Sequence, residues 1–89
     1  MRKGKKTVDK ALWPVDVMQE IQMVMEEGER AGKRGWEKEY VSNHIHKAEA
    51  HLLAYFTAGA DSDEDHLAHA FTRLMMAMAI ERGYVKGTR

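Results

Sequence analysis

The chain has 89 residues and no cysteine, which fits one compact domain without disulfides or thiolate metal sites. Its 14 lysines and arginines balance 14 aspartates and glutamates, so the formal net charge is zero. No apolar run approaches the ~20 residues that span a bilayer, and no apolar stretch follows the basic N-terminus as in a signal peptide. We therefore expect a cytoplasmic domain without a membrane segment. A chain this short buries only about 60–65% of its unfolded surface, so we also expect a homo-oligomer of two or more copies.

The charges are unevenly distributed along the chain. Residues 1–10 carry five Lys or Arg and one Asp, and residues 81–89 carry three Lys or Arg and one Glu. Residues 11–80 carry six basic and twelve acidic side chains, together with all five histidines. An acidic body that contains histidines is typical of a divalent-cation site, whereas a nucleic-acid surface would be basic, so nucleic acid is not an expected partner. The competing interpretation is that the acidic residues solvate helix surfaces.

Three stretches carry apolar residues at helical spacing, and no alternating β-branched run predicts a strand. We expect helices at about 14–31, 40–58 and 63–82. The predicted fold is all-α, an antiparallel three-helix bundle completed by oligomerisation. This helical domain would span residues 13–83, between flexible basic tails at 1–12 and 84–89.

The third predicted helix combines a start signal with a wide apolar surface. Ser62 is a good N-cap, and Asp65 three residues later completes an S-x-x-D capping pattern. Its apolar stripe consists of Leu67, Ala70 or Phe71, Leu74 and Met78. A surplus of methionines widens the apolar surface beyond what one partner helix covers: Met75, Met76 and Met78, with Met18 and Met25 on the first helix. We expect this methionine-rich face to contact a second copy or another protein.

The densest group of chemically active side chains is the run from Asp61 to His69. On a helix, His66 and His69 are three residues apart and Asp65 and His69 are four apart, so they lie on nearby faces. Carboxylates and imidazoles one turn apart can share a metal ion, with carboxylates favouring Mg²⁺ or Mn²⁺ and histidines favouring Zn²⁺. The alternative is that the acids complement a helix dipole and the histidines are surface residues.

Other candidates lie on the first two predicted helices and between them. Glu26 and Glu29 form an E-x-x-E motif, which places two carboxylates on one side of a helix. His51 lies near the apolar stripe of the second helix, where a histidine is commonly a packing residue. Trp36 lies in a polar loop flanked by glycine, so it is expected to fold onto a core or line a pocket. No Walker, Rossmann or Ser/His/Asp pattern is present, which excludes these classes of catalytic site.

Four motifs follow one another in an order that points to a known family. They are Gly28 through Gly35-Trp36, then Ala50-His51-Leu52-Leu53-Ala54-Tyr55, Gly59-Ala60-Asp61-Ser62-Asp63, and His66-Leu67-Ala68-His69-Ala70. Over roughly residues 13–82 the chain resembles the N-terminal domain family of the dATP/dGTP diphosphohydrolases. That family is associated with bacteriophages and is similar to the MazG-like all-α nucleotide pyrophosphohydrolases. Here the E-x-x-E pair is not followed by the E-x-x-D motif of that wider group.

The resemblance implies a metal-dependent pyrophosphohydrolase acting on purine deoxynucleoside triphosphates, in the host cytoplasm if a phage encodes it. An acidic site needs Mg²⁺ or Mn²⁺ to bind a polyanion and activate water. The implied catalytic residues are His51, His66 and His69. The implied substrate-binding residues are Trp36 and Lys33. The implied metal ligands are Asp61, Asp63, Glu26 and Glu29. The alternative is a catalytically inactive, phage-type helical protein that binds a host or phage protein through its methionine-rich face.

Overall fold

The computed structural model describes residues 11–58 and 62–86. The described part contains three helices and a short 3-10 helix, and no strand: α1 (Val15–Arg30), η1 (Trp36–Lys38), α2 (Val41–Ala58) and α3 (His66–Glu81). The prediction of an all-α fold with three helices is therefore confirmed. The predicted tails at 1–12 and 84–89 lie largely outside the described residues, as do Gly59 and Asp61. None of the described helices has the length and apolarity to cross a bilayer.

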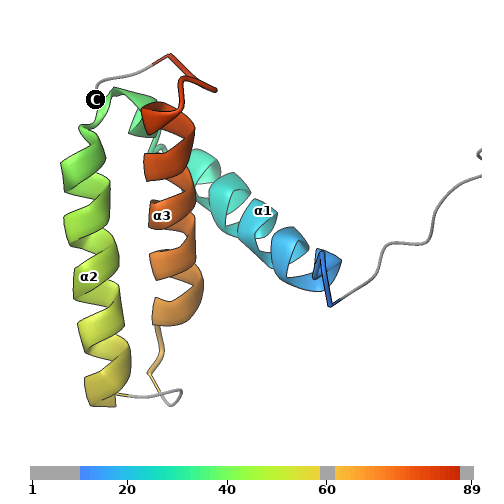
Figure 1. The fold of residues 1–89 in the computed structure, drawn as a ribbon. Coiled ribbons are helices and arrows are strands. Elements are labelled where there is room, and N and C mark those ends of the chain that lie inside the picture. The colour runs from blue at the N-terminus through green and yellow to red at the C-terminus, as the bar shows by residue number, and fades with distance from the viewer. Residues whose placement is uncertain (1–10, 59–61, 87–89) are drawn as a thin grey trace, which may run out of the picture.

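The helices form an antiparallel pair with an inclined third helix (Figure 1). α2 and α3 lie side by side along their lengths, and α1 approaches α3 at an angle. The backbones of α1 and η1 both approach α3, whereas the backbone of α1 does not come close to that of α2. The result is a helical hairpin with one helix leaning against one side of it. This geometry opens a cleft between α1 and the hairpin.

Two of the predicted helix ends coincide with glycines in a left-handed conformation. α1 ends before Gly32, whose φ is 80°, and α3 ends before Gly83, whose φ is 74°. The backbone N–H of Lys33 donates to the carbonyl of Gly28 at 2.8 Å, which satisfies a carbonyl that the helix leaves free. A side chain with a Cβ would disfavour this backbone conformation, so glycine stops the helix at both places.

The start of α3 differs from the prediction. The cap is Asp65, whose Oδ1 accepts the backbone N–H of Ala68 at 3.1 Å, and the helix begins at His66. The Ser62 hydroxyl, predicted to be the cap, instead accepts the backbone N–H of Glu64 at 3.2 Å. Both side chains satisfy a free backbone donor, but only Asp65 reaches the first turn of the helix. Glu64 therefore precedes the helix instead of belonging to it.

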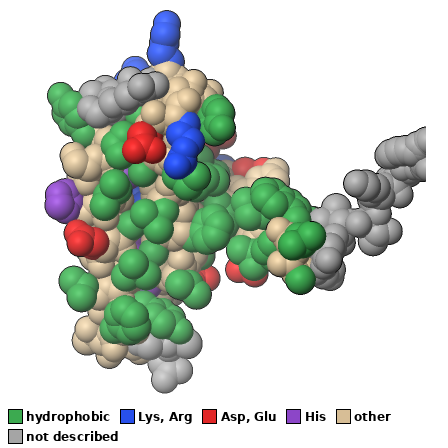
Figure 2. Space-filling view, in the orientation of Figure 1, with side chains coloured by type: hydrophobic (Ala, Val, Ile, Leu, Met, Phe, Trp, Pro, Cys, Tyr) green, Lys and Arg blue, Asp and Glu red, His purple; other side chains and the backbone are tan. Residues whose placement is uncertain are grey.

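The hydrophobic core is small. The buried apolar residues are Ile21, Ala48, Ala70, Ala77 and Ile80, and two of these five have large side chains. Of the predicted α3 stripe, Ala70 is buried, whereas Leu67, Phe71, Leu74 and Met78 are 42–54% exposed. Figure 2 shows apolar side chains spread over the front of both α2 and α3. The buried apolar residues of α3 are Ala70, Ala77 and Ile80, whereas the large side chains of the stripe remain at the surface.

A buried polar chain connects the elements around the core. His44 on α2 is fully buried, and its Nε2 lies 2.8 Å from the backbone carbonyl of Trp36. Arg73 on α3 places Nη1 2.9 Å from His44 Nδ1 and 3.4 Å from Glu39 Oε1. Because a guanidinium only donates, Nδ1 accepts and the Nε2–H donates to the Trp36 carbonyl. Three elements, η1, α2 and α3, are joined through this one imidazole.

Glu39 completes this chain at the protein surface. Burial alone would raise the pKa of the Glu39 carboxyl, but the positive charges of Lys47 and Arg73, helped by His44, outweigh it and hold the pKa below its ordinary value. Lys47 Nζ lies 3.5 Å from Glu39 Oε1. The ionised carboxylate thereby neutralises the partly buried guanidinium of Arg73.

We expect the substitution His44→Ala to lower the free energy of unfolding by about 2–3 kcal/mol, because it leaves the Trp36 carbonyl and Arg73 without their partner. The control is His46→Ala, two residues along the same helix, whose side chain is 76% exposed. That change should stay within about 0.5 kcal/mol. Urea denaturation followed by circular dichroism measures both. Equal effects of the two substitutions would contradict the structural role given to His44.

Candidate functional site

A cleft of about 890 Å³ lies between α1 and the α2–α3 hairpin. Its walls come from the C-terminal half of α1, from the segment that joins α1 to η1, and from the facing sides of α2 and α3. The volume is within the range of small-molecule sites. The cleft is therefore large enough for a ligand of nucleotide size.

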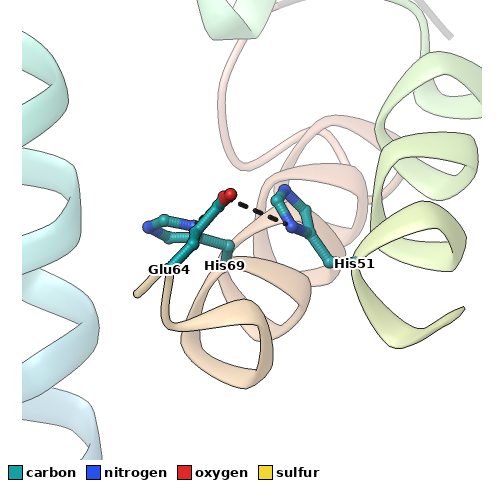
Figure 3. A group of neighbouring side chains, drawn as sticks. All are labelled: His51, Glu64 and His69. Carbon is teal, nitrogen blue, oxygen red and sulfur yellow. Dashed lines mark hydrogen bonds and ion pairs between the residues drawn. The ribbon is translucent and has the colours of Figure 1, made fainter. Parts of the chain in front are cut away.

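Two histidines and a glutamate meet in this cleft (Figure 3). His51 comes from α2, Glu64 from the turn before α3, and His69 from the first turns of α3. Each offers one ligand atom, and these atoms all lie within 4.8 Å of one another. His69 Nδ1 lies 2.8 Å from Glu64 Oε2, and His51 Nδ1 lies 3.5 Å from the same oxygen. We call this group the His51–Glu64–His69 cluster.

The local sequence explains how the cluster is assembled. The cap at Asp65 starts α3, and the backbone N–H of His69 donates to the Asp65 carbonyl at 3.0 Å, which fixes His69 in the first turns. Glu64 lies outside the helix, so its direction is set by the turn and its carboxylate folds back onto His69. Figure 3 shows the ring of His69 extending toward α1. Because Nδ1–H donates to Glu64, the Nε2 lone pair of His69 remains available to a ligand.

A third histidine supports the cluster from the side. His66 Nδ1 lies 3.0 Å from His51 Nδ1, and the two ring centroids are 5.3 Å apart. Such a contact is a hydrogen bond when one nitrogen carries a proton and the other does not. The side chain of His66 is only 14% exposed and is not part of the cleft wall. His66 therefore orients His51, and a ligand in the cleft would meet His51 first.

Burial and neighbouring charges shift the acidity of the cluster. Burial is the largest cause that lowers the pKa of His51 below its ordinary value near 6.5. The nearby His69, His66 and Arg73 lower it further, and the Glu64 carboxylate opposes them. The hydrogen bond from His69 is the largest cause that holds the pKa of Glu64 below 4.5. At neutral pH the cluster thus presents a neutral imidazole beside an ionised carboxylate.

This donor set is one that metal ions use in proteins. A metal about 2.0–2.2 Å from nitrogen and oxygen ligands holds those ligands roughly 3–4 Å apart. In the cluster, the three ligand atoms lie within 4.8 Å of one another, close enough to be drawn onto one ion. Two imidazoles and one carboxylate suit Zn²⁺, Mn²⁺ and related ions. Mg²⁺ prefers oxygen ligands throughout. Among the described residues, the cluster is the group that could hold an ion.

The structure gathers several of the predicted site residues and separates others. His51 and His69 are in the cluster, and His66 is beside it. The cleft walls also include Glu26, Glu29, Lys33 and Trp36. Asp63 is exposed and lies outside both the cluster and the cleft wall. Asp61 lies outside the described residues.

The residues that α1 and η1 contribute to the cleft have partners of their own. Glu29 pairs with Arg34, and Glu26 accepts a hydrogen bond from Gln22 at 3.2 Å. The Trp36 ring is half-buried and stands edge-on to the His44 ring, with 6.3 Å between their centroids. The α1 carboxylates face the same cleft as the cluster but are not among its closely spaced donors.

Two residues of the cleft were not singled out by the sequence. Glu64 lies in the same acidic run as the predicted ligands, but a helix beginning at 63 would turn it away from His69. Asp65 is also a suitable capping residue. A helix start placed after Asp65 would have left Glu64 in the preceding turn, from which it reaches His69. Arg73 follows His69 by four residues, so helical spacing alone places both on one side of α3.

A family model for "dATP/dGTP diphosphohydrolase, N-terminal" matches residues 1–87, nearly the whole chain. The chain belongs to this family. The match confirms the resemblance that the ordered motifs indicated, and it identifies the domain as a helical domain of a diphosphohydrolase family. Searches of curated proteins and of solved structures give no significant match.

The lowered pKa of His51 predicts how stability depends on pH. The unfolded chain binds the His51 proton more tightly than the folded domain does, so stability is full above about 6.5 and falls as pH drops below it. The substitution His51→Gln should flatten the change in unfolding free energy between pH 7.5 and about 5.5. The Glu64 carboxylate acts in the same direction at lower pH, below 4.5.

Urea denaturation at several pH values measures this effect, with the exposed His46→Gln as the control. The control should keep the pH dependence of the parent protein. A His51→Gln variant that loses stability with acid as steeply as the parent would contradict the assignment.

Proposed function

We propose that the domain is a metal-dependent pyrophosphohydrolase for purine deoxynucleoside triphosphates. The observation that carries this proposal is the His51–Glu64–His69 cluster inside a cleft of about 890 Å³. Membership of the dATP/dGTP diphosphohydrolase N-terminal family supplies the substrate class. The reaction would cleave the triphosphate with water into a monophosphate and pyrophosphate.

The walls of the cleft suit the parts of such a substrate. Lys33, Arg34 and Arg73 supply positive charge for phosphate oxygens, and Arg73 is held in place by His44 and Glu39. Trp36 offers an aromatic surface against which a base can stack. These side chains come from both walls, so a nucleotide would span the cleft between α1 and the hairpin.

The carboxylates of the cleft repel a triphosphate, so a divalent ion is part of the proposal. Such an ion would supply positive charge for the substrate phosphates and would help to activate the attacking water. Of the two ions expected from the family resemblance, Mn²⁺ suits two imidazoles and one carboxylate better than Mg²⁺ does. His51, Glu64 and His69 would hold it, with Glu26 and Glu29 facing it from α1.

The three histidines have different proposed roles. His51 is neutral at pH 7, so it can accept a proton or act as a ligand, and His66 fixes the orientation of its ring. The Glu64 carboxylate orients His69 by accepting its Nδ1–H. As a proposed metal ligand, Glu64 takes the role that the family resemblance implied for Asp61 and Asp63.

Binding of an ion to the folded domain alone should stabilise it. At a hundredfold excess over Kd, we expect about 2.7 kcal/mol. For a domain of this size that corresponds to a rise in Tm of roughly 10–20 °C. Melting curves with Mn²⁺, Mg²⁺ and Zn²⁺, each beside a Na⁺ control of matched ionic strength, measure it. The rise should be larger with Mn²⁺ than with Mg²⁺.

Two glutamate substitutions distinguish metal binding at the cluster from nonspecific metal binding to surface carboxylates. Glu64→Gln should remove most of the Tm rise, because it removes a charged ligand. Glu49→Gln is the matched control, since Glu49 also contacts a histidine, His46 at 3.3 Å, but on the exposed side of α2. Equal loss of the Tm rise in both variants, or no rise with any ion, would contradict the metal site.

The activity itself is tested by pyrophosphate release. With Mn²⁺ we expect release from dATP and dGTP to exceed release from dCTP and dTTP. Glu64→Gln should lower kcat/KM by about 10- to 100-fold, the range for loss of a ligand or its orienting partner. Glu49→Gln should keep the parent rate. Metal binding without pyrophosphate release from any of the four substrates would refute the activity and leave the metal site standing.

A further inference from the structure

We infer that His44 is a positioning residue of the candidate site, which holds the Arg73 guanidinium so that one edge of it binds a phosphate group of the nucleotide. This role rests on the proposed function and adds to it a specific pair of donors and the side chain that fixes them. Arg73 lines the cleft, and its side chain is 25% exposed, so it is partly buried and still within reach of a ligand. Its partner His44 is fully buried.

Arg73 uses one corner of its guanidinium for contacts with the protein. Each hydrogen bond or ion pair that it makes with the described residues involves Nη1, which lies 2.9 Å from His44 Nδ1 and 3.4 Å from Glu39 Oε1. A guanidinium has five N–H donors, so those on Nε and Nη2 are left for a ligand. Nε–H and one Nη2–H point the same way along one edge, and this fork matches two oxygens of a phosphate.

Two hydrogen bonds on opposite sides of the ring hold His44 in one orientation. Because Nε2–H donates to the Trp36 carbonyl at 2.8 Å, the lone pair of Nδ1 is directed at Arg73. The contact joins α2 to α3, so the guanidinium is fixed from the neighbouring helix. A free arginine would lose side-chain entropy when it bound a phosphate, whereas Arg73 has lost much of that entropy on folding.

The charges around Arg73 remain favourable to an anion. Glu39 Oε1 lies 3.4 Å from Arg73 Nη1 and 3.5 Å from Lys47 Nζ, so one negative charge is shared between two positive ones. The lowered pKa of Glu39 keeps its carboxylate ionised at neutral pH. These three side chains together retain one positive charge. A carboxylate paired with Arg73 alone would cancel more of the attraction for a phosphate.

Arg73 lies next to the His51–Glu64–His69 cluster. It follows His69 by four residues, about one turn of α3, and both side chains line the cleft. The charge of Arg73 is among the causes that lower the pKa of His51, so its electrostatic influence reaches the cluster. A polyphosphate with one phosphate group at the cluster would therefore place a neighbouring phosphate group near the free edge of Arg73.

Amide substitutions separate the two hydrogen bonds of His44. In His44→Asn the amide oxygen takes the position of Nδ1 and keeps an acceptor for Arg73, but the bond to the Trp36 carbonyl is lost. In His44→Gln the amide nitrogen takes the position of Nε2 and keeps the donor to that carbonyl, but Arg73 loses its acceptor. Both variants should be less stable than the parent, and only His44→Gln should release Arg73.

We expect His44→Gln to raise the Kd for inorganic pyrophosphate about tenfold, and His44→Asn to stay within about twofold of the parent. Isothermal titration calorimetry measures the Kd, once with Mn²⁺ and once in metal-free buffer of low ionic strength, at a temperature where circular dichroism shows each protein folded. The order of affinities should be the same in both buffers, because Arg73 is not a metal ligand. Equal weakening by the two variants would show a purely structural role and overturn the inference.

Arg73→Lys keeps the test decisive where a His44 variant fails to fold. It retains the positive charge but loses the fork, so the Kd for pyrophosphate should rise about 10- to 100-fold. Arg82→Lys is the matched control, since Arg82 follows α3, is 47% exposed and pairs with its neighbour Glu81. That control should keep the parent Kd.

Two results would overturn the assignment of Arg73: an unchanged Kd in Arg73→Lys, or a parent protein that binds no pyrophosphate in either buffer. Pyrophosphate binding with the expected order of affinities, but without hydrolysis of any deoxynucleoside triphosphate, would refute the proposed function and leave the role of His44 standing. Where hydrolysis is present, His44→Gln should raise KM for dATP more than it lowers kcat, because the lost contact belongs to binding.

Discussion

A buried imidazole holds together the elements that form the cleft. His44 donates from Nε2 to the Trp36 carbonyl and accepts at Nδ1 from Arg73, so one side chain joins η1, α2 and α3. The backbone of α1 does not come close to that of α2, and the wall that leads from α1 to η1 is fixed to the hairpin through His44. A buried polar group is tolerated only when its hydrogen bonds are made, and here both nitrogens are satisfied. The position of the Trp36 wall relative to the histidine cluster depends on this arrangement.

The cleft is lined by side chains of opposite charge. Several carboxylates face it together with Lys33, Arg34 and Arg73, and Glu64 lies among three histidines. A site with this mixture can accept a cation at its acidic part and phosphate oxygens at its basic part. The lowered pKa of His51 keeps one imidazole neutral where it faces that cation position. A metal-dependent reaction on a polyanion fits this distribution of charge.

The amino-acid sequence by itself determined the helices and most of the candidate site. Apolar spacing predicted three helices, and the ends of α1 and α3 lie beside Gly32 and Gly83, because a left-handed backbone is favourable for glycine. The ordered histidine motifs identified the family, which the family model confirmed. The resemblance to that family pointed to His51 and His69 as site residues. These features depend on residues close in the sequence, where local rules hold.

Only the tertiary structure decided where individual side chains point and which face of each helix is buried. Two capping residues competed for the start of α3, and the choice of Asp65 placed Glu64 in a turn from which it reaches His69. Periodicity predicted the α3 stripe but not which side faces the protein, since a wide apolar surface has two candidate directions. Ala70, Ala77 and Ile80 are buried in the structure, whereas Leu67, Phe71, Leu74 and Met78 are exposed. Which surface a helix buries depends on its neighbours, and no spacing rule contains that information.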